Sequence, residues 1–241
     1  MLETALLMLT AHLLGDFVFQ PDALIARKTS AAGMLGHVAI IGVLTALCLT
    51  PTHGLGWCAV LIVTLTHLIM DMVKVHLLGD RLWAFLADQA VHLAVIAAVA
   101  VLWPGLAQQS LLESLPGNVQ ANVYAGLALV CGLTVGIPVG GVVIRKLVEP
   151  LMPASPIAGM KNAGRYIGWL ERALSITFFL INQPEAIGFL LAAKSILRFR
   201  DIQDQTDRHQ AEYIIIGTFL SFGWALLTAL AARAAINHWL G

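Results

Sequence analysis

Charged residues are scarce in this sequence. Only 12% of its 241 residues are Asp, Glu, Lys or Arg, and 59% are hydrophobic, whereas about a quarter of an average soluble domain is charged. The mean hydropathy is +0.82, and apolar runs recur along the whole chain. Runs of about 20 apolar residues are typical of membrane-spanning helices, not of one large soluble core. We therefore expect an integral membrane protein.

Other absences exclude further classes of protein. The three cysteines, Cys48, Cys58 and Cys131, stand singly without a CxxC motif, so neither a disulfide framework nor a thiolate metal site is expected. The formal net charge is zero, which argues against a nucleic-acid partner. The first residues, MLETALLMLTAHLLGDF, lack the basic start and cleavage site of a secretory signal. We interpret them as the first spanning helix.

The spacing of apolar runs, Pro, Gly and charges predicts the fold class. We expect an all-α polytopic transmembrane bundle of about eight helices, of which the seventh is short enough to be tilted or re-entrant. Residues 1–104 would form a four-helix half, and 119–241 a second half with a glycine-rich packing helix and cations near the cytoplasmic side. The predicted spans are 2–20, 33–50, 56–75, 83–103, 119–144, 166–182, 186–200 and 211–235.

Positive charge predicts the orientation. Eleven of the fourteen Lys and Arg residues lie on one side of the predicted topology, and cytoplasmic loops carry such an excess. Both termini are therefore predicted to lie outside the cytoplasm. The eleven residues are Arg27, Lys28, Lys74, Arg81, Arg145, Lys146, Lys161, Arg165, Arg198, Arg200 and Arg208.

Histidine and aspartate form three pairs at i,i+4 spacing inside the predicted helices. Residues four apart share a helix face, and an aspartate inside the bilayer costs about 2.5–3.5 kcal/mol on insertion scales. These side chains must therefore face one another, water or a bound cation. With the rise of about 1.5 Å per residue, the pairs and His37 fall in one layer of the cytoplasmic leaflet. The pairs are His12/Asp16, His67/Asp71 and Asp88/His92.

The same residues suggest an internal repeat. A shift of 55 residues relates His12 to His67, Asp16 to Asp71, and His37 to His92. Both copies would have the same orientation in the membrane, so they would be parallel repeats of two helices each.

Imidazole and carboxylate ligands together suit a divalent metal, and we expect zinc or manganese. Two alternatives without metal stay open: a proton relay, and a hydrogen-bonded polar core. In the metal interpretation Asp88 is a bridging ligand or the general base. The predicted metal ligands are His12, Asp16, His37, His67, Asp71 and His92.

Further polar residues are candidates for binding a substrate. Gln20 continues the stripe of the first pair by four residues. In the second half, cations either pair with Glu171 or Glu212, or hold an anionic group such as a lipid phosphate. These cations are Arg172, Lys194 and Arg198.

The sequence defines no role for three polar residues near the pairs. Lys28 has the pattern of an ordinary interfacial residue. Lys74 either pairs with Asp71 or extends its charge to the interface. Gln89 adjoins Asp88 but points about 100° away on a helix.

Several segments together resemble an uncharacterised bacterial family, the domain of unknown function thirty-three-oh-seven. The resemblance spans nearly the whole chain. It implies a bacterial inner-membrane protein, with both termini then periplasmic, but no activity. The segments are AHLLGDFVFQPDALIARK, THLIMDMVK, DQAVH, GRYIGWLER, GFLLAAKSILRFR and EYIIIGTFLSF.

The residues themselves favour a membrane-embedded metal-dependent hydrolase acting on a membrane lipid or lipid-linked substrate near the cytoplasmic leaflet. The alternative is a metal-ion or proton-coupled transporter that uses the same cluster, although the first four helices contain no interior proline. A noncatalytic membrane scaffold is a third hypothesis. The sequence also leaves a homo-oligomer open.

Overall fold

A computed structural model describes residues 1–151, 162–199 and 208–241, with side chains for 1–151, 162–196 and 212–241. Within these ranges every regular element is helical, as the sequence predicts. The chain divides into two compact units. The first comprises Met1–Thr134 with Ala235–Gly241, and the second comprises Val135–Ala234.

Five helices in the described ranges are long and apolar enough to cross a membrane, which identifies a helical membrane protein by length and composition. Three other predicted spans are shorter or more polar in the structure. The helices α1 and α9 have 16 and 15 residues, and α8, with 18, carries several charged residues. The five membrane-length segments are Ala31–Leu49, Gly54–Leu78, Leu82–Leu102, Gly117–Leu151 and Glu212–Leu240.

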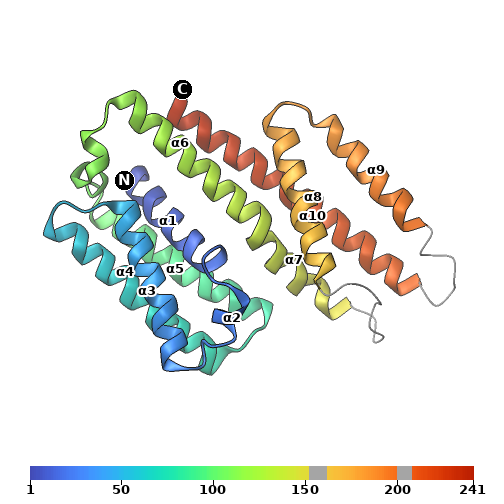
Figure 1. The fold of residues 1–241 in the computed structure, drawn as a ribbon, viewed down its shortest axis with the longest axis horizontal. Helices are drawn as coiled ribbons and strands as arrows, with labels where there is room; N and C mark the ends of the chain where they lie inside the picture. The colour runs from blue at the N-terminus through green and yellow to red at the C-terminus, as the bar shows by residue number, and fades with distance from the viewer. Residues whose placement is uncertain (152–161, 200–207) are drawn as a thin grey trace. The chain divides into compact units, whose positions relative to one another are not determined.

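The first unit is a bundle in which α1 is central (Figure 1). This helix packs against α3, α5 and α6, while α4 lies between α3 and α5. The four helices α1, α3, α4 and α5 therefore surround a common interior. The elements of this unit are α1 (Leu2–Phe17), α2 (Asp22–Ile25), α3 (Ala31–Leu49), α4 (Gly54–Val73), a π-helix (Lys74–Leu78), α5 (Leu82–Leu102), two 3₁₀ turns (Ala107–Gln109, Leu111–Ser114) and α6 (Gly117–Thr134).

The interior of the first unit has an apolar part and a polar part. The apolar part includes Leu7 and Met8 of α1, Leu49 of α3 and Ile96 of α5, all at most 5% exposed. Side chains from the same helices form the polar part, further along α1. Apolar packing thus holds together the helices that carry the polar residues.

The connection from α1 to α3 packs tightly over the start of α3. Ser30 caps α3, since its hydroxyl accepts a hydrogen bond from the Gly33 amide. A Cβ at Gly33 would lie 2.1 Å from the carbonyl oxygen of Arg27, so only glycine permits this approach. The contact fixes the segment that carries Lys28.

The second unit contains a π-helix (Val135–Val139), α7 (Gly140–Val148), a 3₁₀ turn (Glu149–Leu151), α8 (Ala163–Leu180), α9 (Glu185–Phe199) and α10 (Arg208–Leu240) as far as Ala234. Two residues of the glycine-rich stretch lie at close helix contacts. A Cβ at Gly136 would meet Ile176 at 2.3 Å, and one at Gly140 would meet Trp224 at 2.5 Å. The small side chains therefore allow α8 and α10 to approach this stretch closely.

Candidate metal centre

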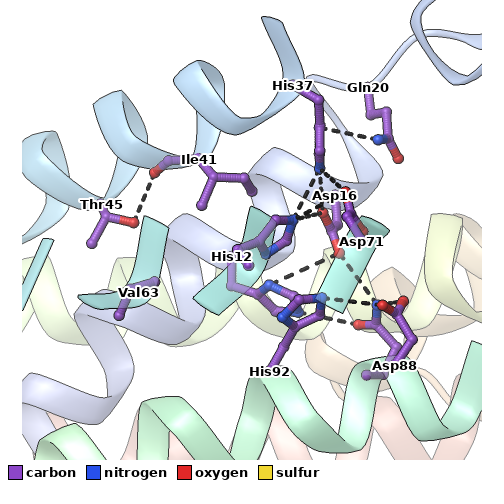
Figure 2. Close-up of polar contacts among 12 residues, drawn as sticks. His12, Asp16, Gln20, His37, Ile41, Thr45, Val63, Asp71, Asp88 and His92 are labelled. Carbon is purple, nitrogen blue, oxygen red and sulfur yellow. Dashed lines mark hydrogen bonds and ion pairs between the residues drawn. The ribbon is translucent and has the colours of Figure 1, made fainter. Parts of the chain in front are cut away.

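Histidine and aspartate side chains from α1, α3, α4 and α5 meet in the interior of the first unit (Figure 2). All seven residues that the sequence places in one layer are part of this cluster. Their side chains are at most 7% exposed. The cluster consists of His12, Asp16, His37, His67, Asp71, Asp88 and His92.

Four of these residues present ligand atoms at coordination spacing. The Nε2 atoms of His37 and His67 lie 3.0 Å apart. Asp16 Oδ1 lies 3.1 and 3.3 Å from these two nitrogens, and Asp71 Oδ2 lies 3.3 and 3.6 Å from them. Ligands about 2.0–2.1 Å from a tetrahedral zinc are about 3.3 Å apart. Within this quartet, Asp16, His37 and His67 have the spacing of one metal's ligand shell, and Asp71 Oδ2 adjoins both histidines.

Two further groups overlap this quartet. One ligand atom each from His12, His67 and His92 lie within 4.8 Å of one another, as do atoms of Asp71, Asp88 and His92. The rings of His67 and His92 are stacked, with centroids 4.1 Å apart. In Figure 2, Asp16 and Asp71 lie between His37 on one side and His92 on the other. This arrangement can accommodate two ions with a shared aspartate.

Three buried atoms of the cluster have no hydrogen-bond partner among the described residues: Asp16 Oδ1, Asp88 Oδ1 and His92 Nε2. Asp88 Oδ1 and His92 Nε2 are 3.2 Å apart, but without the geometry of a hydrogen bond. Burying such atoms unpaired costs about 1–3 kcal/mol each. All three belong to groups with metal-ligand spacing, so a bound cation would satisfy them.

Gln20 favours one tautomer of His37. With its amide oriented to satisfy both ends, Gln20 donates to the Asp16 carbonyl at 3.0 Å and accepts from His37 Nδ1 at 3.0 Å. The proton of His37 is then on Nδ1, and the Nε2 lone pair points into the quartet. A histidine that ligates a metal is usually held in this way.

Gln89 joins three members of the cluster. Its Nε2 donates to Asp16 Oδ2 at 3.2 Å and Asp88 Oδ2 at 3.1 Å. Its Oε1 therefore faces His12 Nε2, at 3.1 Å, as an acceptor. Sequence reasoning left this residue without a role, because a helical wheel separates it from Asp88. It reaches α1 because α1 and α5 pack together.

Two lysines form ion pairs with the buried carboxylates. Lys28 Nζ lies 2.7 Å from Asp71 Oδ2, and Lys74 pairs with Asp88 Oδ2. The lysine side chains are 12% and 23% exposed, whereas both aspartates are at most 2% exposed. The lysines thus lie between the buried cluster and its surroundings. Three buried aspartates require cations that compensate their charge. This requirement is the sequence signal that could have identified Lys28.

The predicted substrate-binding cations of the second half belong to the second unit. The guanidinium of Arg172 donates to the Ile137 carbonyl and to the Ser221 hydroxyl, each at 3.0 Å. Lys194 forms an ion pair with Glu171 at 2.7 Å. The side chain of Arg198 lies outside the described residues.

The fold and the cluster define a class: a helical membrane protein with a buried His/Asp centre in its N-terminal bundle. Residues 4–116 match the family described as "Protein of unknown function (DUF3307)". The match contains the whole cluster but not the resembling segments between 164 and 222. Comparison with curated proteins and with solved structures gives no match in either case.

Proposed function

We propose that this protein is a membrane-embedded metal-dependent hydrolase acting on a lipid or lipid-linked substrate near the cytoplasmic leaflet of the bacterial inner membrane. The observation that carries the proposal is the quartet, in which the ligand atoms of Asp16, His37 and His67 lie 3.0–3.3 Å apart and Asp71 Oδ2 lies 3.3 and 3.6 Å from the two histidine nitrogens. Mixed imidazole and carboxylate ligands favour zinc or manganese.

Asp88 is the proposed catalytic residue. Its Oδ2 is occupied by Lys74 and Gln89, while its Oδ1 has no hydrogen-bond partner among the described residues. A divalent ion lowers the pKa of a bound water towards about 7. With such an ion held by the quartet, Asp88 Oδ1 would accept a proton from the water, and Gln89 would hold the carboxylate in place.

Exposed apolar side chains on the same helices support a lipid substrate. The helices of the cluster carry large apolar side chains on their outer faces, including Leu35 on α3, Leu65 and Ile69 on α4, and Leu86 on α5. Their inner faces carry the cluster. A lipid beside the bundle would therefore be close to the centre, and the positive-inside pattern assigns this end to the cytoplasm, with both termini periplasmic.

One observation favours a transporter as the second candidate. The helix containing Asp71 changes to a π-helix at Lys74–Leu78, three residues after the proposed ligand. Interrupted helices frequently carry ion sites in transporters. In this alternative the cluster binds a transported metal ion or protons.

Metal analysis of the purified full-length protein tests the proposal. We expect about one or two equivalents of zinc or manganese in the parent, and loss of metal in His67→Ala and Asp71→Ala. His53→Ala is the matched control, because His53 is exposed at the start of α4 and away from the cluster. No stoichiometric metal in the parent, with both cluster variants unchanged, contradicts the proposal.

A second experiment separates hydrolysis from transport. Protein in proteoliposomes is supplied with the metal, and its uptake is followed with and without a pH gradient. A hydrolase retains its metal and shows no uptake above that of protein-free vesicles. Uptake that follows the gradient, and is lost in His67→Ala, supports the transporter instead.

A further inference from the structure

The two lysines are unexpected in a site that only binds cations. Lys28 pairs with Asp71 and Lys74 with Asp88, and both aspartates belong to the groups with metal-ligand spacing. An ammonium group competes with a metal for the carboxylate and repels it at short range. A centre for a divalent cation alone would bind it better without the lysines.

The charge balance indicates what the lysines are for. With neutral imidazoles, Asp16, Asp71 and Asp88 together with the two lysines carry a net charge of −1. One divalent ion makes the centre net positive, and a second makes it more so. Uncompensated charge is costly in buried surroundings. The metal-loaded centre therefore favours an anionic ligand.

Phosphate is the anion that fits these groups. Its several oxygens can contact a metal on one side and ammonium groups on another, as metal and lysine do in phosphoryl-transfer sites. The lysine side chains are 12% and 23% exposed, so their ammonium groups lie at the edge of the cluster, where an incoming ligand would meet them. A flat carboxylate has only two oxygens on one edge, which suits this arrangement less well.

We propose that the metal-loaded centre binds a phosphate group that Lys28 and Lys74 contact directly, and that the substrate is a phosphate ester. This inference rests on the proposed function and names its substrate class. In the reaction, the oxygen of a water forms a new P–O bond, and the P–O bond to the lipid alcohol breaks. Asp88 receives one proton from the water, and this proton leaves with the alcohol oxygen.

Binding of inorganic phosphate tests the proposal. Full-length protein in a phosphate-free maltoside detergent, with and without manganese, is titrated calorimetrically with inorganic phosphate. We expect binding only when metal is present, weakened about 10–100-fold in Lys28→Met and in Lys74→Met. Arg27→Met is the matched control, since it removes an exposed cation one residue from Lys28. Acetate in place of phosphate should bind no better to the parent than to the lysine variants.

Metal affinity in the same variants excludes a merely structural role. If the lysines serve the anion, Lys28→Met and Lys74→Met tighten manganese binding while they weaken phosphate binding, because a competing cation is gone. If the lysines only hold the aspartates, both affinities fall together. Lys28→Arg, which retains the charge, should restore phosphate binding.

A competition experiment with a phospholipid distinguishes a lipid phosphate from free phosphate. Phosphatidic acid in nanodiscs should compete with inorganic phosphate for the site, and its hydrolysis should release phosphate. If the site takes free phosphate only, this lipid does not affect phosphate binding. Phosphate binding that is equal in the parent and in a Lys28→Met/Lys74→Met double variant, with metal retained, overturns this inference alone. Absence of metal from the parent overturns the proposed function and this inference with it.

Discussion

The two units of the molecule treat buried charge in different ways. In the second unit, the guanidinium of Arg172, 4% exposed, donates to the Ile137 carbonyl and the Ser221 hydroxyl. Ile137 lies in the π-helix that contains Pro138, where the regular pattern of backbone hydrogen bonds is interrupted. Trp224 donates to the Val135 carbonyl of the same segment. The Arg172 cation therefore donates a hydrogen bond to a backbone carbonyl of this interrupted helix.

In the first unit, charged groups surround atoms that are left unpaired. Asp16 Oδ1, Asp88 Oδ1 and His92 Nε2 are buried without a hydrogen-bond partner among the residues that the structure describes. The contrast shows that burial of a charged group does not by itself indicate a site. Unsatisfied acceptor atoms at coordination spacing are what separate the cluster around Asp16 from the surroundings of Arg172.

Replacing a ligand in the first unit should have the largest effect. Asp16→Asn removes a charge from the quartet. Loss of a supporting hydrogen bond lowers metal affinity by up to about 100-fold, and we expect loss of this ligand to lower it further. Glu113→Gln is the control, because this exposed acid lies outside the cluster. Competition with a fluorescent chelator measures the affinity. Equal affinities for the two variants would remove Asp16 from the site.

Loss of a supporting contact should have a smaller effect. Gln89→Leu takes away hydrogen bonds to His12, Asp16 and Asp88, and we expect metal affinity to fall by about 10–100-fold. Gln108→Leu, at an exposed position in the same unit, should leave it unchanged. An unaltered affinity in Gln89→Leu would show that these contacts do not position the ligands.

A substitution in the second unit should lower stability and leave metal binding unchanged. Arg172→Met leaves the Ile137 carbonyl without its donor, and the free energy of unfolding should fall by about 1–3 kcal/mol. Denaturation in mild detergent measures this change, and metal content is determined on the same sample. Loss of metal in Arg172→Met, without loss of stability, would contradict the division between the two units.

An effect on stability alone is also expected in the segment that carries Lys28. Gly33→Ala places a Cβ 2.1 Å from the Arg27 carbonyl oxygen, so the segment must move, at a cost of about 1–3 kcal/mol in unfolding free energy. Gly36→Ala, in the same helix, would meet only Leu24, at 3.8 Å, and should be neutral or slightly stabilising. Thermal unfolding compares the two. Equal melting temperatures would show that the close approach at Gly33 is unimportant.

The helical membrane class and the composition of the cluster were predictable from sequence because both depend on periodicity. Apolar runs mark helices, and i,i+4 spacing places His12 and Asp16 on one face. Charge patterning then placed these residues in one layer with Asp88. None of this requires knowledge of which helices are neighbours.

The partners of individual residues were not predictable, since they depend on how the helices pack. Lys74 was expected to pair with Asp71 on its own helix or to extend away, but it pairs with Asp88 of α5. Lys28 pairs with Asp71 because the connection from α1 folds back over α3 at Gly33. The short α1 shows a further limit, because apolar residues beyond Phe17 continue the pattern without continuing the helix.

X-ray absorption spectroscopy at the metal edge tests the central claim most directly. In the full-length protein we expect nitrogen and oxygen ligands about 2.0–2.1 Å from zinc, with the multiple-scattering signature of at least two imidazoles. That signature should weaken in His37→Ala and stay unchanged in His53→Ala. A spectrum of fully hydrated metal, or one identical in the parent and His37→Ala, would contradict the assignment of this cluster as a metal centre.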